Sequence, residues 1–406
     1  FIGGLAGQGI TGAKLTGNSN VAVGTNAGLL LQGAAHSNTL IGAASGDAVT
    51  TGIQNTFVGQ ASGTAVTTGA NNVAIGYVAL ASATTAADNV IVGKQAGFSI
   101  TDSQFNVGVG NNAIQALTTG DRNVAVGHSA MYALTTASDN IAIGNEAGVA
   151  VTTGAENVLM GSYAGDAITT GASNTAMGYN ALGSVTTASY NVGIGQSAGG
   201  AITTGEKNVF LGFGAGDATT TADNNTAVGY DALTENTTGA QNVAVGNLAL
   251  DANTTASSGT AVGYNALGTN TTGAQNTAVG EGALADNSTG ATNTAVGQEA
   301  MANNTTASDS TAVGRKALFT NTTGGANVAL GETSLYANTT GANNVAVGRL
   351  SLTANTTANN NTAVGNACLD ANTTGASNSS LGASSLGANT TGANNVAVGN
   401  DALGAN

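Results

Sequence analysis

The sequence predicts an all-β protein that folds as a parallel β-solenoid, in which each repeat of the sequence winds into one of a series of stacked coils. The segment N-[T/V]-A-V-G recurs along the chain, and its glycine falls at a constant interval, at Gly42, Gly59, Gly76 and onward to Gly399. A fixed period held without insertion or deletion is the signature of a solenoid. Apolar residues make up 41% of the chain and recur at fixed positions, which argues against disorder. Proline is absent, as suits a chain whose backbone N–H groups feed a continuous ladder.

The start of each repeat is predicted to be a short strand. We number the repeat 1 to 17 from its Asn, so that positions 2 and 4 are residues such as Val73 and Ile75. Residues two apart on a strand share a face, and we expect this apolar pair to face the core. Position 3 is mostly alanine, as at Ala74, and points the other way. Because a strand that is apolar on both faces is covered on both, we expect position 3 to meet another chain.

The remainder of the repeat predicts a bend, a second strand and a corner. Position 5 is glycine in every copy, which indicates a positive φ or a close backbone approach. Positions 8 and 9 are typically Ala-Leu, as at Ala232-Leu233, and predict a short second inward-facing strand. Positions 13 and 14 are nearly always Thr-Thr, and position 15 is usually Gly or Ala, which is typical of a tight corner.

Three segments are predicted. Residues 1–37 are irregular, because the spacing is 21 from Gly3 to Gly24 and 18 from Gly24 to Gly42, and we expect a cap or a junction there. Residues 38–224 carry an apolar residue at position 12 in ten coils, such as Val49 and Ile202. Residues 225–406 carry asparagine at that position. We therefore expect a solenoid with an apolar corner followed by a solenoid with an asparagine ladder.

The asparagines at position 12 are the candidate structural site of the chain. Stacked once per coil, such amides can hydrogen-bond to the coils above and below, as in cross-β stacks. Each also opens a formal N-glycosylation sequon, N-T-T or N-S-T, but sequons in register come with any repeat of this sequence, so we favour the ladder. The predicted ladder consists of Asn236, Asn253, Asn270, Asn287, Asn304, Asn321, Asn338, Asn355, Asn372 and Asn389.

Several classes of function are disfavoured. The net charge of −14 and only seven basic residues argue against a nucleic-acid partner. No apolar run is long enough to insert into a membrane, and no secretory signal begins at Phe1. His128 and Ser129 are adjacent but lack the third group of a triad, and no metal-binding spacing occurs, so we expect no enzyme and no cofactor. Cys368, at a position otherwise filled by Ala or Ser, is predicted to be a small buried residue.

The residues N-[TV]-A-V-G-x-x-[AS]-L resemble the head repeats of trimeric autotransporter adhesins, the YadA-like family. The longer form N-T-A-V-G-Y-x-A-L-x-x-N-T-T-G resembles repeat arrays of phage tail fibres and bacterial surface fibres. The resemblance covers Asn20 to Asn406. It implies a left-handed β-roll, a homotrimer, and a role as an adhesive or spacing shaft. The period of this chain is longer than these heads usually show, and no neck, stalk or barrel is present in the sequence.

The leading expectation is a non-catalytic homotrimeric fibre, extracellular, on a bacterial surface or a virion tail, whose partner is an unknown surface receptor or glycan. The chain has no initiator Met, and we expect a processed or partial chain anchored elsewhere. An ice- or crystal-binding solenoid is the alternative, although the adjacent threonines Thr237-Thr238 are expected to point to opposite sides. A polysaccharide-active solenoid enzyme would need a cleft with clustered acids, and the acids here are scattered.

Overall fold

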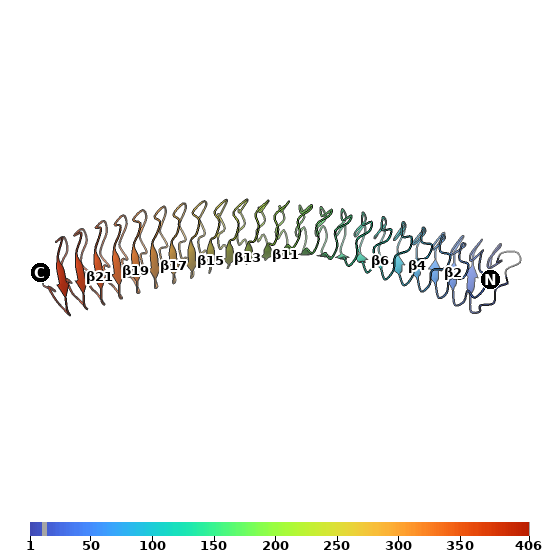
Figure 1. Cartoon of the computed structure of the whole chain (residues 1–406), viewed down its shortest axis with the longest axis horizontal. Helices are drawn as coiled ribbons and strands as arrows, with labels where there is room; N and C mark the ends of the chain where they lie inside the picture. The colour runs from blue at the N-terminus through green and yellow to red at the C-terminus, as the bar shows by residue number, and fades with distance from the viewer. Residues whose placement is uncertain (10–13, 406) are drawn as a thin grey trace. The chain divides into compact units, whose positions relative to one another are not determined.

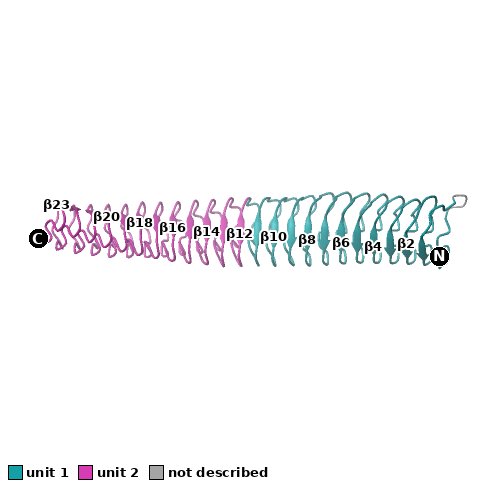
Figure 2. Ribbon diagram, turned by 90° about the horizontal axis from the view of Figure 1, so that it is seen from below, with its two compact units in different colours: residues 1–206 teal, residues 207–406 magenta. Residues whose placement is uncertain are grey.

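The computed structural model describes residues 1–9 and 14–405, which form two compact units, 1–206 and 207–406 (Figure 2). Each unit is a parallel β-solenoid, and no helix occurs in the described part of the chain. The predicted fold class is confirmed, with one coil for each repeat of the sequence. The last apolar residue at position 12, Ile202, lies in the first unit, and the first asparagine, Asn236, lies in the second.

Every coil contributes one strand of three residues (Figure 1). The first unit contains β1 (Val21–Val23), β2 (Thr39–Ile41), β3 (Thr56–Val58), β4 (Val73–Ile75), β5 (Val90–Val92), β6 (Val107–Val109), β7 (Val124–Val126), β8 (Ile141–Ile143), β9 (Val158–Met160), β10 (Thr175–Met177) and β11 (Val192–Ile194). The second unit contains β12 (Val209–Leu211), β13 (Thr226–Val228), β14 (Val243–Val245), β15 (Thr260–Val262), β16 (Thr277–Val279), β17 (Thr294–Val296), β18 (Thr311–Val313), β19 (Val328–Leu330), β20 (Val345–Val347), β21 (Thr362–Val364), β22 (Ser379–Leu381) and β23 (Val396–Val398).

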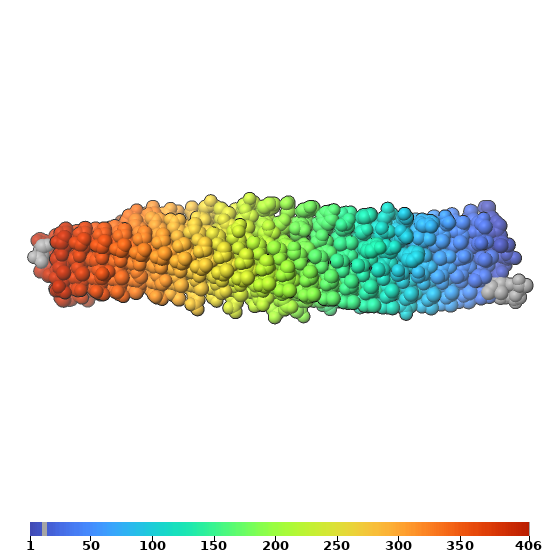
Figure 3. All heavy atoms as spheres, turned by 90° about the horizontal axis from the view of Figure 1, so that it is seen from above, coloured from blue at the N-terminus to red at the C-terminus, as the bar shows by residue number. Residues whose placement is uncertain are grey.

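Within each unit the strands pair in parallel with the next coil. In β13 and β14, for example, Thr226 lies opposite Val243 and Ala227 opposite Ala244. Each residue is therefore paired with the residue at the same repeat position in the next coil. In the space-filling view the coils of each unit follow one another in chain order (Figure 3). Because the register equals the repeat length, each position of the repeat forms a row that runs along the solenoid.

The glycine at position 5 is required by the stacking of coils. It has a φ of 126–143° at positions 42 to 399, as at Gly263 with 135°. A Cβ on Gly263 would lie 2.5 Å from the carbonyl oxygen of Gly280 in the next coil. The prediction of positive φ and close approach is therefore confirmed, since no other residue fits both the conformation and the space.

The predicted orientation of the strands is wrong. In the structure position 3 is buried and positions 2 and 4 face outward: Ala244 is fully buried, whereas Val243 is 37% exposed and Val262 is 36% exposed. Inward and outward residues alternate along the strand as expected, but the residues predicted to face inward face outward, and the reverse. So short a coil encloses too little space for two large side chains per strand, and alanine fits where valine and isoleucine do not.

At positions 3 and 9, most coils pair one large side chain with one small residue. In the coil of β3 the large residue is Phe57 at position 3, and position 9 is Gly63; in the coil of β4 the large residue is Leu80 at position 9, and position 3 is Ala74. A Cβ on Gly63 would meet the Phe57 ring at 2.5 Å. Positions 3 and 9 therefore share one volume, as close packing of an interior requires.

The second strand predicted at positions 8 and 9 is absent from the described coils. These residues are inward-facing, as expected, but they belong to a turn. At position 9 the backbone φ is positive, with values of 58° at Leu233, 51° at Leu250 and 50° at Leu335. Position 12 lies inside as well, with Val49 and Asn236 both fully buried. The coil is thus one short strand closed by tight turns.

The irregular N-terminal segment contains partial coils. Ile2 forms a parallel bridge with Val23, and Leu15 forms one with Gly33. Gly3 and Gly24 have φ values of 132° and 133°, as the glycines of the regular repeat do. The described residues of this segment therefore pair in parallel with their neighbours as the later coils do, and residues 10–13 lie outside the described part.

Candidate functional site

The outward sheet face is the most extensive feature available for recognition. We define it as the residues at positions 2 and 4 of every coil, such as Thr226 and Val228 on β13. All of them are aliphatic, methionine, threonine or serine, and none is charged, although 7% of the chain is charged. Large residues on this face remain partly open to solvent, with Ile75 and Val313 both 38% exposed. Each unit therefore presents a continuous uncharged row of side chains along its sheet.

Charged residues lie on the turns beside this face. Arg122 and Asp139, both at position 17 of successive coils, form an ion pair at 2.6 Å. Hydrogen bonding to Arg122 lowers the pKa of the Asp139 carboxyl, and the carboxylate in turn raises the pKa of the guanidinium. These pairs are exposed and contribute little to stability, but they show that the turns, unlike the sheet face, tolerate charge.

A second exposed network joins three coils at position 6. Glu332 lies between Arg315, at 3.0 Å, and Arg349, at 3.2 Å. Hydrogen bonds from Arg315 and then from Arg349 lower the pKa of the Glu332 carboxyl. The turn surface of the second unit therefore carries charges in register from coil to coil.

The ten predicted ladder asparagines form one stack inside the second unit. From Asn253 onward, the amide nitrogen of each donates to the Oδ1 of the asparagine one coil earlier, over distances of 2.7 Å at Asn304 to 3.2 Å at Asn270. The same nitrogen commonly donates a second bond to the carbonyl three residues ahead, as Asn304 does to Ala307 at 3.0 Å. An interior member such as Asn304 thus has both N–H groups and its carbonyl satisfied.

A second asparagine ladder runs through position 1, and the sequence analysis assigned it no role. Asn55 donates to the Oδ1 of Asn38 from its backbone N, at 3.0 Å, and from its side chain, at 3.2 Å. Its amide nitrogen also donates to the carbonyl of Gly69 at 2.9 Å and so closes the coil. The signal was present, because asparagine opens nearly every repeat. Its interior location depends on which side of the strand faces the interior, and the repeat pattern alone does not determine that side.

In the second unit the two ladders meet at position 15. The carbonyl of Ala307 accepts from Asn293 of the position 1 ladder at 2.8 Å and from Asn304 of the position 12 ladder at 3.0 Å. Gly341 and Gly375 accept in the same way. A glycan on Asn304 would require a fully buried amide to leave these bonds. The geometry favours the structural role of the sequon asparagines over the glycan role.

The Thr-Thr corner separates two kinds of threonine. Thr237 at position 13 is half-buried and donates its hydroxyl to the carbonyl of Thr254 in the next coil at 3.0 Å. Thr238 at position 14 is exposed. Position 14 is threonine in every complete coil except at Asp102. The corner therefore presents a single exposed rank of threonines, spaced by one coil, about 4.8 Å.

There is no group of three or more His, Cys, Asp or Glu side chains that could hold a metal ion in residues 1–9 and 14–405. Cys368 is fully buried, as predicted, and its burial raises the pKa of the thiol. A search of this same part of the chain finds no helix that could span a membrane.

Neither a protein-family model nor a curated protein matches the sequence. The interpretation therefore depends on the sheet face, the ladders and the turns described above.

Proposed function

We propose that this chain is a non-catalytic fibre segment whose copies associate through the outward sheet face, as a homotrimer, to form an extracellular shaft or adhesin. One observation carries the proposal: the outward face is uncharged on every strand of both units, and position 4 is aliphatic or methionine on all of them. Parallel sheets are normally covered on both faces, and an open apolar surface of this length promotes association. A partner that covers this face must have side chains at the same spacing as its strands, which is one strand per coil. A second copy of the chain has the same strand spacing because it has the same coils.

The stoichiometry and the setting come from the sequence resemblance. The repeat resembles the heads of trimeric surface adhesins and the arrays of tail fibres, in which three chains pack side by side. The internal ladders support a mechanical role, because each coil is hydrogen-bonded to the next through backbone, asparagine and threonine groups. A bacterial surface or a virion tail is the setting that we propose for such a shaft.

The proposal is tested by placing charges on the outward face of alternate coils. We expect Val228→Asp, Val262→Asp and Val296→Asp together to dissociate the assembly, because each interface would bury unpaired carboxylates at several kcal/mol apiece. Light scattering should then report 38.7 kDa in place of three times that mass. Circular dichroism should remain that of a β protein, since the side chains point away from the interior.

The matched control moves the charge by one residue. Ala227→Asp, Ala261→Asp and Ala295→Asp lie on the buried side of the same strands and should unfold these coils rather than release intact monomers. The sequence analysis assigned position 3 to the interface, and the structure places these alanines inside. An unmutated chain that is monomeric at high concentration would refute the proposal.

An ice- or crystal-binding surface is the second candidate function. The strands β15 to β18 present four successive Thr-x-Val pairs, from Thr260 and Val262 to Thr311 and Val313, on the same outward face. Adjacent threonines such as Thr237 and Thr238 are expected to point to opposite sides. The Thr and Val of these pairs are two residues apart on a strand, so their side chains share one face. An ice-recrystallisation assay on the wild type and on Val262→Asp separates the candidates: inhibition by a monomer that the substitution abolishes would favour this alternative.

A further inference from the structure

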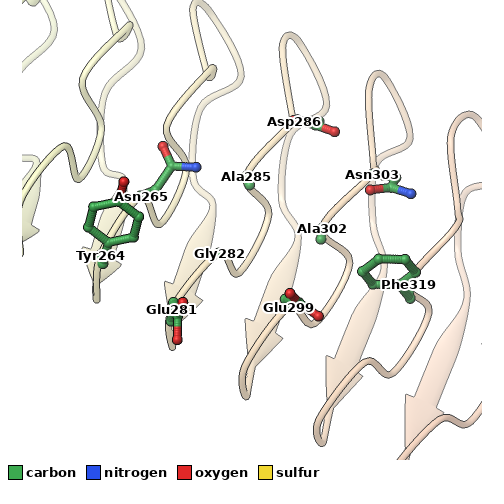
Figure 4. A pocket seen from close by; sticks show the side chains of 10 residues that line it. All are labelled: Tyr264, Asn265, Glu281, Gly282, Ala285, Asp286, Glu299, Ala302, Asn303 and Phe319. Carbon is green, nitrogen blue, oxygen red and sulfur yellow. The ribbon is translucent and has the colours of Figure 1, made fainter.

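The second unit contains a groove on its turn surface, lined by none of the residues at positions 2 and 4. It has a volume of about 280 Å³ and crosses several coils (Figure 4). One rim consists of Tyr264, Glu281 and Glu299, from positions 6 and 7 of successive coils, and the other of Asp286 and Asn303, from position 11. The rims come from different parts of each turn, so the groove runs along the stack of coils.

The groove exists because position 10 is small in two neighbouring coils. Ala285 and Ala302 form its floor, and Phe319, at the same position of the next coil, forms its end wall. The Phe319 ring stacks on Tyr336 one coil further on, with centroids 5.3 Å apart and planes inclined by 7°. Its other face is turned toward the coil of Ala302. Phe319 therefore closes one end of the trough.

Lys316 completes the wall. Its ammonium lies 3.1 Å from the Glu299 carboxylate and 5.1 Å from the centroid of the Phe319 ring. The other rim carboxylate, Glu281, accepts a hydrogen bond from Gln298 at 3.3 Å. With Asp286 the groove carries three carboxylates and one neighbouring cation, so its field is negative and repels anionic ligands.

We infer that this groove binds a short non-anionic oligosaccharide, either neutral or carrying amino groups. Tyr264, which is 56% exposed, supplies an aromatic surface at one end, and Phe319, with the Lys316 ammonium over its ring, closes the other end. Between them, carboxylate and amide groups on both rims supply acceptors and donors for ring hydroxyls. The volume lies near the lower limit of small-molecule sites and suits one or two sugar rings. Charge excludes acidic sugars, and a purely apolar ligand would leave the rim groups unpaired.

The inference rests on the attachment role proposed above and specifies its ligand class. The groove residues occupy positions 6, 7, 10 and 11, whereas association uses positions 2 and 4, so assembly through the sheet face leaves these turn residues outside the paired rows. In a trimer the groove would occur three times at one level of the shaft, and binding to a surface of many glycans would gain from this multivalency.

The experiment is calorimetric titration of the full chain with tetrasaccharides of N-acetylglucosamine, glucose, glucosamine and galacturonic acid. We expect at least one of the first three to bind and the acidic one not to bind. Ala302→Phe should abolish binding by filling the trough. This substitution is compatible with the coil, because position 10 is already aromatic at Phe319 and Tyr336. Tyr264→Ala should weaken binding by about tenfold.

Two controls in the first unit match these variants. Ala81→Phe introduces the same ring at position 10 of another coil, and Tyr179→Ala removes a tyrosine that is also at position 6 and also 56% exposed. Neither should change the affinity. No binding by any non-acidic sugar, preferred binding of the acidic one, or equal affinity of Ala302→Phe and wild type would overturn the inference. The mass of the unliganded chain distinguishes this outcome from failure of the fibre proposal, because a trimer that binds no sugar refutes only the groove.

Discussion

At the scale of single residues, the buried amides are what distinguish this interior from an ordinary apolar core. Asn304 contributes an N–H to the coil before it, an acceptor to the coil after it and a second N–H to its own turn. A buried polar group is favourable only when all its partners are supplied, and a periodic chain supplies them by repetition. The other asparagine ladder, at position 1, stacks in the same way in both units, although the buried amide nitrogen of Asn225 has no hydrogen-bond partner.

Asn304→Ala is therefore expected to destabilise the chain by about 1–3 kcal/mol, because it leaves Asn287 Oδ1 and an N–H of Asn321 unpaired in the interior. Asn389→Ala, nearer the end of the run, should cost less. Asn366→Ala, at the exposed position 6, should change stability by less than about 0.5 kcal/mol. Denaturant unfolding of the three variants measures the differences. Equal, negligible shifts for Asn304 and Asn389 would show that the ladder contributes nothing.

At the scale of the element, the interior of each coil has a nearly fixed volume, which the side chains at positions 3 and 9 share. Where position 3 is large, position 9 is glycine; where position 3 is alanine, position 9 is Leu or Met in most coils, and Gly108 is paired with Ile114. The coil of β8 carries Ala142 and Gly148, and its neighbour fills the gap, since a Cβ on Gly148 would lie 2.5 Å from Cδ1 of Leu159. Where the side chains of one coil do not fill its interior, a large side chain of the adjacent coil fills the remaining space.

The coil of β12 offers a direct test of this exchange. Phe210→Ala alone should cost about 3–5 kcal/mol through the cavity it leaves. Gly216→Leu alone should also destabilise, because a Cβ there would lie 2.6 Å from the Phe210 ring. The double variant has the Ala-and-Leu arrangement of the next coil, Ala227 and Leu233, and should recover most of the loss. A double variant as unstable as the sum of the two would contradict the shared volume.

At the scale of the whole molecule, the chain is two compact units with one construction. The inner row of asparagines, the outward sheet face and the glycine of positive φ occur in both. In a solenoid each coil contacts only its neighbours, so stability is approximately a sum over coils and interfaces. No unit depends on a distant part of the chain for its core.

A fragment of residues 207–406 is accordingly expected to fold by itself and to self-associate as the full chain does, because β12 to β23 keep the entire outward face of this unit. With fewer coils it should unfold at lower denaturant concentration than the full chain. Circular dichroism and light scattering check both statements. A disordered fragment would show that the units are not independent, and a folded monomer would place the association surface in the first unit.

The period, the parallel β-solenoid, the glycine of positive φ at position 5, the buried Cys368 and the register that stacks Asn236 to Asn389 could all be predicted from the sequence. They follow from repetition, since residues one repeat apart must lie one above another whatever the interior of the coil contains. Which side of the strand faces the interior became known from the folded coil. Alternation divides Val243, Ala244 and Val245 into two sets but does not say which set is enclosed, and the width of a coil closed by tight turns selects the alanine. The same turns bring Tyr264 and Phe319 to the two ends of one groove, which no spacing in the sequence could indicate.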